Sequence, residues 1–145
     1  MLRGVLVVAA LALGATAVVA ESDPIAARKA LMKANGDQAK IGSAMVKGEA
    51  PFDLAKAQVI FATFSDAASK AGDLFPPTSK TGGDTQALPK IWENMDDFKA
   101  KLAKLGADAK AAASSVKDLD SFKAAMGNIG KQCGGCHELY RQKKT

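Results

Sequence analysis

The apolar residues of this 145-residue chain recur in steps of three and four, and this spacing is the strongest constraint on its fold. Residues at such a spacing share one face of an α-helix. Three segments carry such a row: Ala57, Ile60, Phe61, Phe64 and Ala68; Ile91, Met95, Phe98, Leu102 and Leu105; and Phe122, Met126, Ile129, Cys133, Cys136 and Tyr140. We therefore expect helices that each bury one face, with both cysteines pointing inward from the last of them.

The composition and the helix-start signals support the same fold class. After residue 20 the chain has 23 Ala against 13 Val, Ile and Thr together, which disfavours strands. N-cap and proline signals occur at Ser22-Asp23-Pro24, Asp53, Leu88-Pro89 and Asp118. A less regular first segment covers residues 24–47. The sequence predicts an all-α, antiparallel four-helix bundle with helices of about 17 to 25 residues and its longest loop at 72–88.

Residues 1–20 have the pattern of a secretory signal peptide. Arg3 precedes an apolar run from Val5 to Val19, and the run closes on small residues at Ala20. The run is shorter than the roughly 20 residues that span a bilayer. We expect export to a bacterial periplasm with cleavage after Ala20, which leaves residues 21–145 as one domain without a membrane span. The formal net charge then falls from +5 to +4, because only Arg3 is lost.

The last segment contains Cys133-Gly134-Gly135-Cys136-His137. Cys-x-x-Cys-His is the attachment signature of a c-type haem, in which the two thiols form thioethers with the vinyl groups of the porphyrin. On a helix, His137 stands one turn after Cys133, so its imidazole can reach the iron from the anchored side. We expect one covalently bound haem c per chain, with Cys133 and Cys136 as anchors and His137 as the proximal iron ligand.

Other chemistries compete for these residues. A structural or catalytic disulfide could use the cysteine pair, although the redox motif typically lies beside a βαβ pattern that this sequence lacks. A zinc site would need more ligands, and the chain has no further Cys or His. The lysines form no basic stripe of the kind that binds nucleic acid. No catalytic dyad or Gly-rich phosphate loop indicates an enzyme.

A c-type signature on the last helix of a four-helix bundle resembles the class II cytochromes c, the cytochrome c′ family. The resemblance extends over essentially the whole chain after the leader. Its most specific segments are Arg28-Lys29-Ala30-Leu31-Met32-Lys33, Leu74-Phe75-Pro76, Leu88-Pro89-Lys90-Ile91-Trp92 and Gly130 through Arg141. It implies a four-helix bundle with haem c attached to the last helix.

The family has two branches, which differ on the distal side of the iron. In the high-spin branch a bulky residue of the first helix covers an open site that binds nitric oxide or carbon monoxide. In the low-spin cytochrome c-556 branch a methionine is the sixth ligand, and Met32 aligns with it. The resemblance thus implies a one-electron carrier with His/Met ligation, with the gas-binding protein as the alternative. A methionine on an amphipathic helix is also a common core residue.

The resemblance has further implications for the surroundings of the haem. It places Arg28 near a haem propionate, with an exposed cation as the alternative. Arg141, Lys143 and Lys144 follow the haem helix and could steer redox protein partners with acidic surfaces. Relatives also form homodimers through their first two helices. A third hypothesis is a haem-free helical binding protein with a Cys133–Cys136 disulfide.

Overall fold

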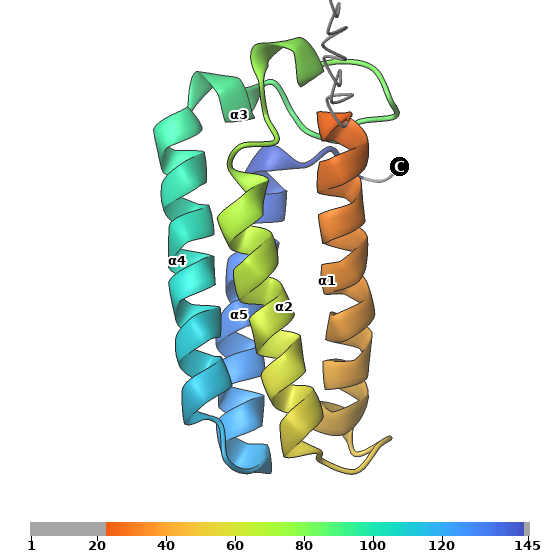
Figure 1. The fold of residues 1–145 in the computed structure, drawn as a ribbon, viewed down its shortest axis with the longest axis vertical. Coiled ribbons are helices and arrows are strands. Elements are labelled where there is room, and N and C mark those ends of the chain that lie inside the picture. The colour runs from red at the N-terminus through yellow and green to blue at the C-terminus, as the bar shows by residue number, and fades with distance from the viewer. Residues whose placement is uncertain (1–22, 144–145) are drawn as a thin grey trace, which may run out of the picture.

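The computed structural model describes residues 23–143, in which four long helices run alternately up and down beside one another (Figure 1). These helices are α1 (Pro24–Lys47), α2 (Leu54–Ala71), α4 (Met95–Ser115) and α5 (Leu119–Tyr140). The expected antiparallel four-helix bundle is confirmed. None of the helices in this described part combines the length and apolar character needed to cross a membrane. The expected leader, its cleavage site and Lys144 lie outside the described residues.

Three of the long helices, α1, α2 and α5, begin where the N-cap signals predict. The carboxylate of Asp23 accepts a hydrogen bond from the Ile25 amide at 2.9 Å, and that of Asp53 accepts one from Lys56 at 3.0 Å. Asp118 and Ser121 form a reciprocal capping box at the start of α5. Each cap satisfies amide groups that have no partner within the first turn of a helix.

The third predicted helix is interrupted in the structure, so the prediction of one continuous helix in this segment was wrong. The chain forms one turn, α3 (Lys90–Glu93), and breaks at Asn94 before α4 begins. Asn94 has φ −132° and ψ 46°, and its side-chain amide donates to the Lys90 carbonyl at 3.2 Å. Asparagine commonly interrupts helices through such bonds to nearby backbone. The apolar row survives the break, because Ile91 and Phe98 are both buried.

The bundle has two ends with different connections. We call the end with the short connections 48–53 and 116–118 the closed end. The opposite end, where α1 begins, α5 finishes and residues 72–89 connect α2 to α3, is the loop end; a 3-10 turn, η1 (Pro77–Ser79), lies in that connection. The closed-end core contains Met45, Ala57, Ile60, Phe61, Phe64, Ala109, Ala112, Val116, Phe122 and Ile129. The loop-end core contains Ala71, Ile91, Phe98, Leu102 and Tyr140.

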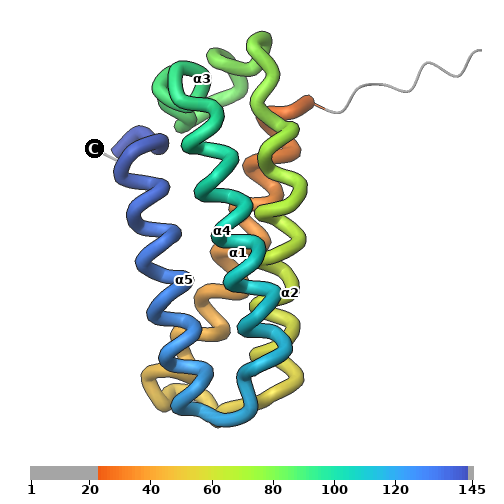
Figure 2. Tube along the Cα trace, turned by 90° about the vertical axis from the view of Figure 1, so that its left-hand side faces the viewer, coloured from red at the N-terminus to blue at the C-terminus, as the bar shows by residue number. Residues whose placement is uncertain are grey.

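Helices α1 and α5 approach each other closely only near the closed end. A Cβ atom placed on Gly42 of α1 would lie 2.6 Å from the Cε atom of Met126 on α5, so the missing side chain permits this approach. The two helices diverge toward the loop end (Figure 2). Of the four pairs of long helices that are neighbours in the bundle, α1 and α5 are packed least closely. The backbones of α1 and α5 are therefore farther apart at the loop end than at the closed end.

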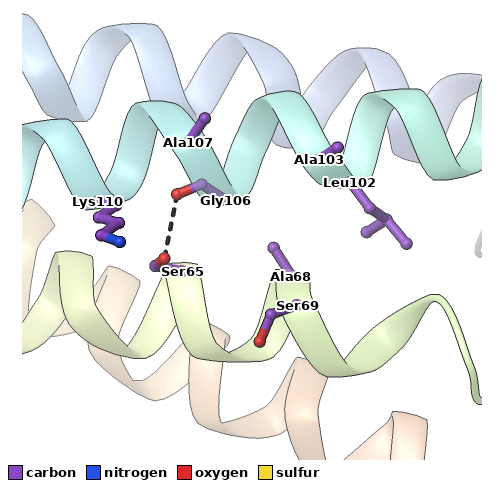
Figure 3. A pocket seen from close by; sticks show the side chains of 8 residues that line it. All are labelled: Ser65, Ala68, Ser69, Leu102, Ala103, Gly106, Ala107 and Lys110. Atoms are coloured by element: carbon purple, nitrogen blue, oxygen red, sulfur yellow. Dashed lines mark hydrogen bonds between the residues drawn. The ribbon is translucent and has the colours of Figure 1, made fainter.

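Helices α2 and α4 pack closely through small residues and leave a shallow groove of about 310 Å³ on the surface (Figure 3). Within it, the Ser65 hydroxyl donates to the Gly106 carbonyl at 3.1 Å. A Cβ atom on Gly106 would lie 3.4 Å from the Cβ atom of Ala68, an ordinary van der Waals distance. The groove can thus accept a methyl group at position 106.

Substitution of Gly106 by alanine is expected to stabilise the protein by about 0.5 to 1 kcal/mol, because glycine costs that much in a helix interior. Gly48→Ala should instead destabilise it by roughly 1 kcal/mol or more, because Gly48 ends α1 with φ 76° in the left-handed region. Urea unfolding of the haem-loaded protein measures both changes. A shift of the same sign for the two variants would contradict this description of the helices.

Candidate functional site

The last turns of α5 carry Cys133, Cys136 and His137 on neighbouring positions of one helix. Residues four apart stack on the same face, so His137 stands one turn beyond Cys133. Both cysteines are half-buried, and they form no disulfide with each other. Cys133 packs against the closed-end core, whereas Cys136 packs against the loop-end core. The three side chains therefore lie at the junction of the two cores.

Burial sets the protonation of these three groups. It raises the pKa of the Cys133 and Cys136 thiols, so both remain protonated near neutral pH. Burial, together with the cation of Arg141, lowers the pKa of His137. The imidazole is therefore neutral at pH 7, which is the form that binds a metal. Reactive redox cysteines have a lowered thiol pKa, so this environment does not match a catalytic dithiol.

The facing surface of α1 is covered at both ends and open between them. Arg28, Met32, Asn35, Ala39 and Gly42 recur in steps of four and three, so they share one face of the helix. Arg28 is only 6% exposed and Gly42 is buried beside Met126. Met32, in contrast, is 40% exposed. This face of α1 is therefore open to solvent at the level of Met32.

Features of both helices fit a bulky planar group beside this face. Gly134 lies within the cysteine motif and Gly130 lies three residues before Cys133, and a Cβ atom on either would have no atom within 4 Å. Two buried acceptors, Asn35 Oδ1 on α1 and Gln132 Oε1 on α5, have no hydrogen-bond partner in the described part of the chain. Buried polar atoms without partners are rare in complete structures. The residues present thus fit a porphyrin attached to α5.

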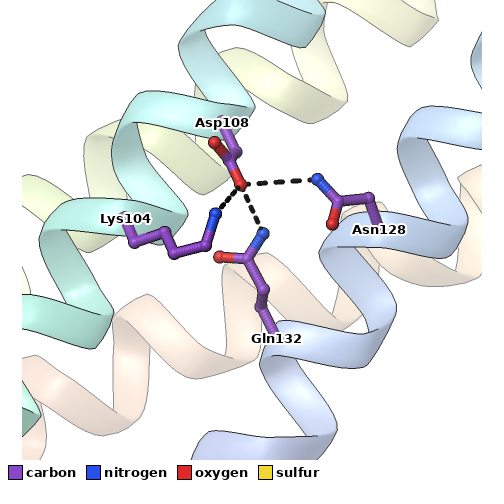
Figure 4. Close-up of polar contacts among 4 residues, drawn as sticks. All are labelled: Lys104, Asp108, Asn128 and Gln132. Carbon is purple, nitrogen blue, oxygen red and sulfur yellow. Dashed lines mark hydrogen bonds and ion pairs between the residues drawn. The ribbon is translucent and has the colours of Figure 1, made fainter.

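Gln132, which directly precedes Cys133, also belongs to a polar network that joins α5 to α4 (Figure 4). The Asp108 carboxylate accepts hydrogen bonds from Gln132 at 2.7 Å, Lys104 at 2.8 Å and Asn128 at 3.4 Å. The bonds from Lys104 and Gln132 hold the pKa of Asp108 below its usual range. This network fixes the helix beside the motif. Its members across the two helices are 20 and 24 residues apart, so no spacing in the sequence indicated it.

Tyr140 stands three residues after His137 and fixes the end of the same helix. Its hydroxyl donates to the Asp97 carboxylate of α4, and its ring packs edge-on against Phe98. The hydrogen bond to Asp97 and burial raise the pKa of Tyr140 to about 12, and the same bond lowers the pKa of Asp97. The apolar row predicted the burial of Tyr140 but gave no indication of its partner.

Arg28 lies at the loop end, where its side chain reaches residues 74–85. Its Nη1 and Nη2 atoms together donate four hydrogen bonds, to Leu74 O, to Ser79 O and Oγ, and to Thr85 Oγ1. The exposed-cation interpretation of Arg28 therefore does not describe this structure. Contact with a haem propionate stays a prediction. Within residues 23–143, the Nε–H group is the one donor group of Arg28 without a hydrogen-bond partner, so it could make that contact.

The zinc interpretation gains no further ligand from the fold. Between residues 23 and 143, no three His, Cys, Asp or Glu side chains come together as a metal site would require. A helical bundle that presents Cys-x-x-Cys-His on the inward side of its last helix defines a haem protein of the c type.

Comparison with known proteins specifies the family. Residues 23–141 match the family model described as Cytochrome C′. The chain is 45% identical over 136 residues to a cytochrome c′ of Rhodopseudomonas palustris, covering 92% of this chain and 91% of the relative. It is 37% identical to a cytochrome c-556 of the same organism, covering 99% of each chain. The solved structure of an R. palustris cytochrome c′ aligns with a TM-score of 0.83 and 47% identity, covering 86% of this chain and all of that one.

The chain therefore belongs to the cytochrome c′ family. It is a monohaem cytochrome, with one haem c bound covalently per chain. The resemblance stated from the sequence is thus confirmed, together with the cofactor.

The raised pKa of Tyr140 leads to a test of the α4–α5 contact. Tyr140 is the only tyrosine, and it should remain protonated at about pH 11, above the ordinary pKa of about 10. Stabilisation from this raised pKa is complete below about pH 10 and is lost as the pH rises through about 12. In Asp97→Asn the pKa should return toward about 10. NMR of the tyrosine ring as a function of pH measures the pKa of Tyr140 in the wild type and in Asp97→Asn. Asp96→Asn is the control and should leave this pKa unchanged. Ionisation of Tyr140 near pH 10 in the wild type would contradict the contact.

Proposed function

We propose that this cytochrome is a one-electron carrier in which Cys133 and Cys136 anchor the haem, His137 is the proximal iron ligand and Met32 is the distal one. The observation that supports this most directly is the face of α1, which is buried at Arg28 and Gly42 and exposed at Met32. A thioether at that position can turn toward a group attached to α5 without displacing core side chains.

The haem, when bound, supplies the reversible one-electron couple. The residues of the chain attach and orient it and restrict access of water. The thiols of Cys133 and Cys136 lie three residues apart on α5, at the junction of the two cores. The neutral imidazole of His137 projects from the same helix. Because all three groups belong to one helix, the proximal side of the site is held rigidly.

Met32 differs from the other described methionines in its surroundings. Met45 is 2% exposed in the closed-end core, and Met95 and Met126 pack against the two cores. Met32 is 40% exposed and belongs to neither core, so the gap-filling role of a core methionine does not apply to it. A His/Met pair raises the reduction potential of a haem relative to two nitrogen ligands, which suits electron transfer.

The second candidate function is binding of nitric oxide or carbon monoxide at an open distal site. The 45% identity to a protein named cytochrome c′ favours it, whereas the match to a cytochrome c-556 over nearly the whole chain favours the carrier. The two functions require different distal residues. Met32 in this position supports the carrier.

The charges at the loop end support an acidic redox partner. Arg141 and Lys143 are exposed just after α5, close to the proposed haem. Opposite charges on a partner would raise the rate of encounter, and added salt would reduce it. The family resemblance further suggests a homodimer. In this proposal the protein is an electron carrier and not an enzyme.

Met32→Ala should abolish the weak sulfur-to-iron band in the far red of the ferric absorption spectrum. Removal of the thioether leaves the iron without its sixth ligand, so the spectrum should become high-spin. Met95→Leu, a swap of similar volume on a methionine outside the site, should retain the band and serves as the control. A high-spin ferric spectrum of the wild-type protein would overturn the carrier in favour of gas binding.

We further propose that the protein is exported to the periplasm and processed after Ala20. The intact mass of the purified protein should then equal residues 21–145 plus one haem. Cys133→Ala combined with Cys136→Ala should abolish covalent haem, whereas Ser69→Ala should retain it. A mature chain that still contains residues 1–20 would contradict processing, and a polypeptide without haem would contradict the attachment.

A further inference from the structure

The loop of residues 72–89 contacts both helices that carry the proposed axial ligands. On the α1 side the contact is made by Arg28, one turn before Met32. Its Nη1 atom donates to Leu74 O at 3.0 Å and to Ser79 Oγ at 2.8 Å, and its Nη2 atom donates to Ser79 O at 2.9 Å and Thr85 Oγ1 at 2.6 Å. One side chain thus binds three separate positions of the loop.

The environment of Arg28 is unusual for a cation. The residue is 6% exposed, and within residues 23–143 no carboxylate forms an ion pair with it. Its guanidinium carbon lies 4.6 Å from the centre of the Phe75 ring and 5.8 Å from that of Trp92. A buried charge is tolerated only when its donors are satisfied. Two carbonyls, two hydroxyls and two aromatic faces provide this here, so the loop must keep its conformation for the charge to stay buried.

On the α5 side the same loop is held by backbone bonds. The Leu88 amide donates to the Tyr140 carbonyl at 3.0 Å, and the Gln142 amide donates to the Gln86 carbonyl at 2.8 Å. Ala87 and Arg141 form an antiparallel bridge between these bonds. The loop is therefore joined to α5 directly after the turn that carries His137.

Apart from this loop, α1 and α5 are linked at the loop end only indirectly, through α2 and α4 and through the loop-end core, against which Leu31 of α1 packs. Their close approach is at Gly42 and Met126, and they diverge from there (Figure 2). Met32 and His137 both lie in the diverging part. The loop joins the two helices at the loop end, at the opposite end of the diverging part from Gly42 and Met126. It is therefore a direct link between α1 and α5 there.

We propose that residues 72–89 form a clasp that sets the distance between α1 and α5, and that Arg28 is the positioning residue that fastens the clasp to α1 and so places Met32. The proposal rests on the proposed function for the role of Met32, but the clasp itself does not. Arg28 acts here through the helix and needs no contact with the haem.

The role is distinguishable from a charge effect or a propionate contact. Ser79→Ala with Thr85→Val removes two hydroxyl partners of Arg28 and leaves its charge in place, but it also removes the bonds from Ser79 Oγ to Pro76 O and from the Ala87 amide to Thr85 Oγ1 within the loop. Arg28→Lys keeps the charge, but a single ammonium cannot serve acceptors spread over three loop positions. If Arg28 fastens a clasp, both variants loosen the loop and weaken the placement of Met32. If Arg28 acts only as a charge, Arg28→Lys leaves both unchanged, so this variant separates the two roles.

The experiment compares these variants of the haem-loaded protein by amide hydrogen exchange and by the far-red band. The control, Thr63→Val with Ser69→Ala, makes the same two kinds of change at exposed hydroxyls of α2 that bond within their own helix. In both test variants the backbone amides at positions 79 and 85 should exchange at least about tenfold faster, and much of the far-red band should be lost. The control should match the wild type.

Unchanged exchange in the Ser79→Ala, Thr85→Val variant, or retention of both the exchange protection and the band in Arg28→Lys, would overturn the proposal. If the wild type lacks the band, the proposed ligation by Met32 fails, and the exchange rates alone still test the clasp.

If the Ser79→Ala, Thr85→Val variant does not fold, Gln142→Pro opens the α5 side of the loop instead. It removes one amide donor, and Arg141 already has the extended conformation that precedes proline, with φ −118° and ψ 137°. Faster exchange at Gln86 to Leu88 with a weaker band supports the clasp, and wild-type behaviour overturns it.

Discussion

The separation of α1 and α5 is the constraint on which the rest of the structure depends. The two helices must meet at one end of the bundle and stand apart at the other. Gly42 allows the meeting, because Met126 occupies the volume where a side chain would be. The closed-end core, with Phe61 and Phe122 fully buried and packed edge to face, stabilises the bundle independently of the open part. The loop end is thereby free to accommodate a cofactor.

The side chains of the proposed site come from two helices. Helix α5 contributes the thiols and the imidazole from fewer than two turns, so their relative positions follow from helix geometry alone. It is fixed to α4 on either side of the motif, by the Asp108 network before Cys133 and by Tyr140 after His137. In the proposed site, helix α1 contributes a single side chain, Met32, and its position depends on long-range contacts. The proximal side is therefore determined locally and the distal side by the tertiary structure.

This division explains how much the sequence could predict. The helices follow from apolar rows with a period close to that of the α-helix, and the attachment motif is five consecutive residues, so both are visible in one short window. The break at Asn94 escaped prediction because the apolar row continues across it. The partners of Arg28 lie 46 to 57 residues away, and no local pattern reports such contacts. The spacing in the sequence placed Met32 on the same helix face as Arg28. Only the fold revealed that this face is buried at Arg28 and exposed at Met32.

X-ray absorption at the iron edge tests the central claim most directly, because it detects the ligand atoms themselves. If α1 presents Met32 to the iron, the ferric protein should show one sulfur scatterer in the first coordination shell besides the nitrogens of the porphyrin and of His137. The thioether sulfurs of Cys133 and Cys136 are bonded to the porphyrin periphery and do not contribute to that shell. A first shell of nitrogen alone would contradict the account.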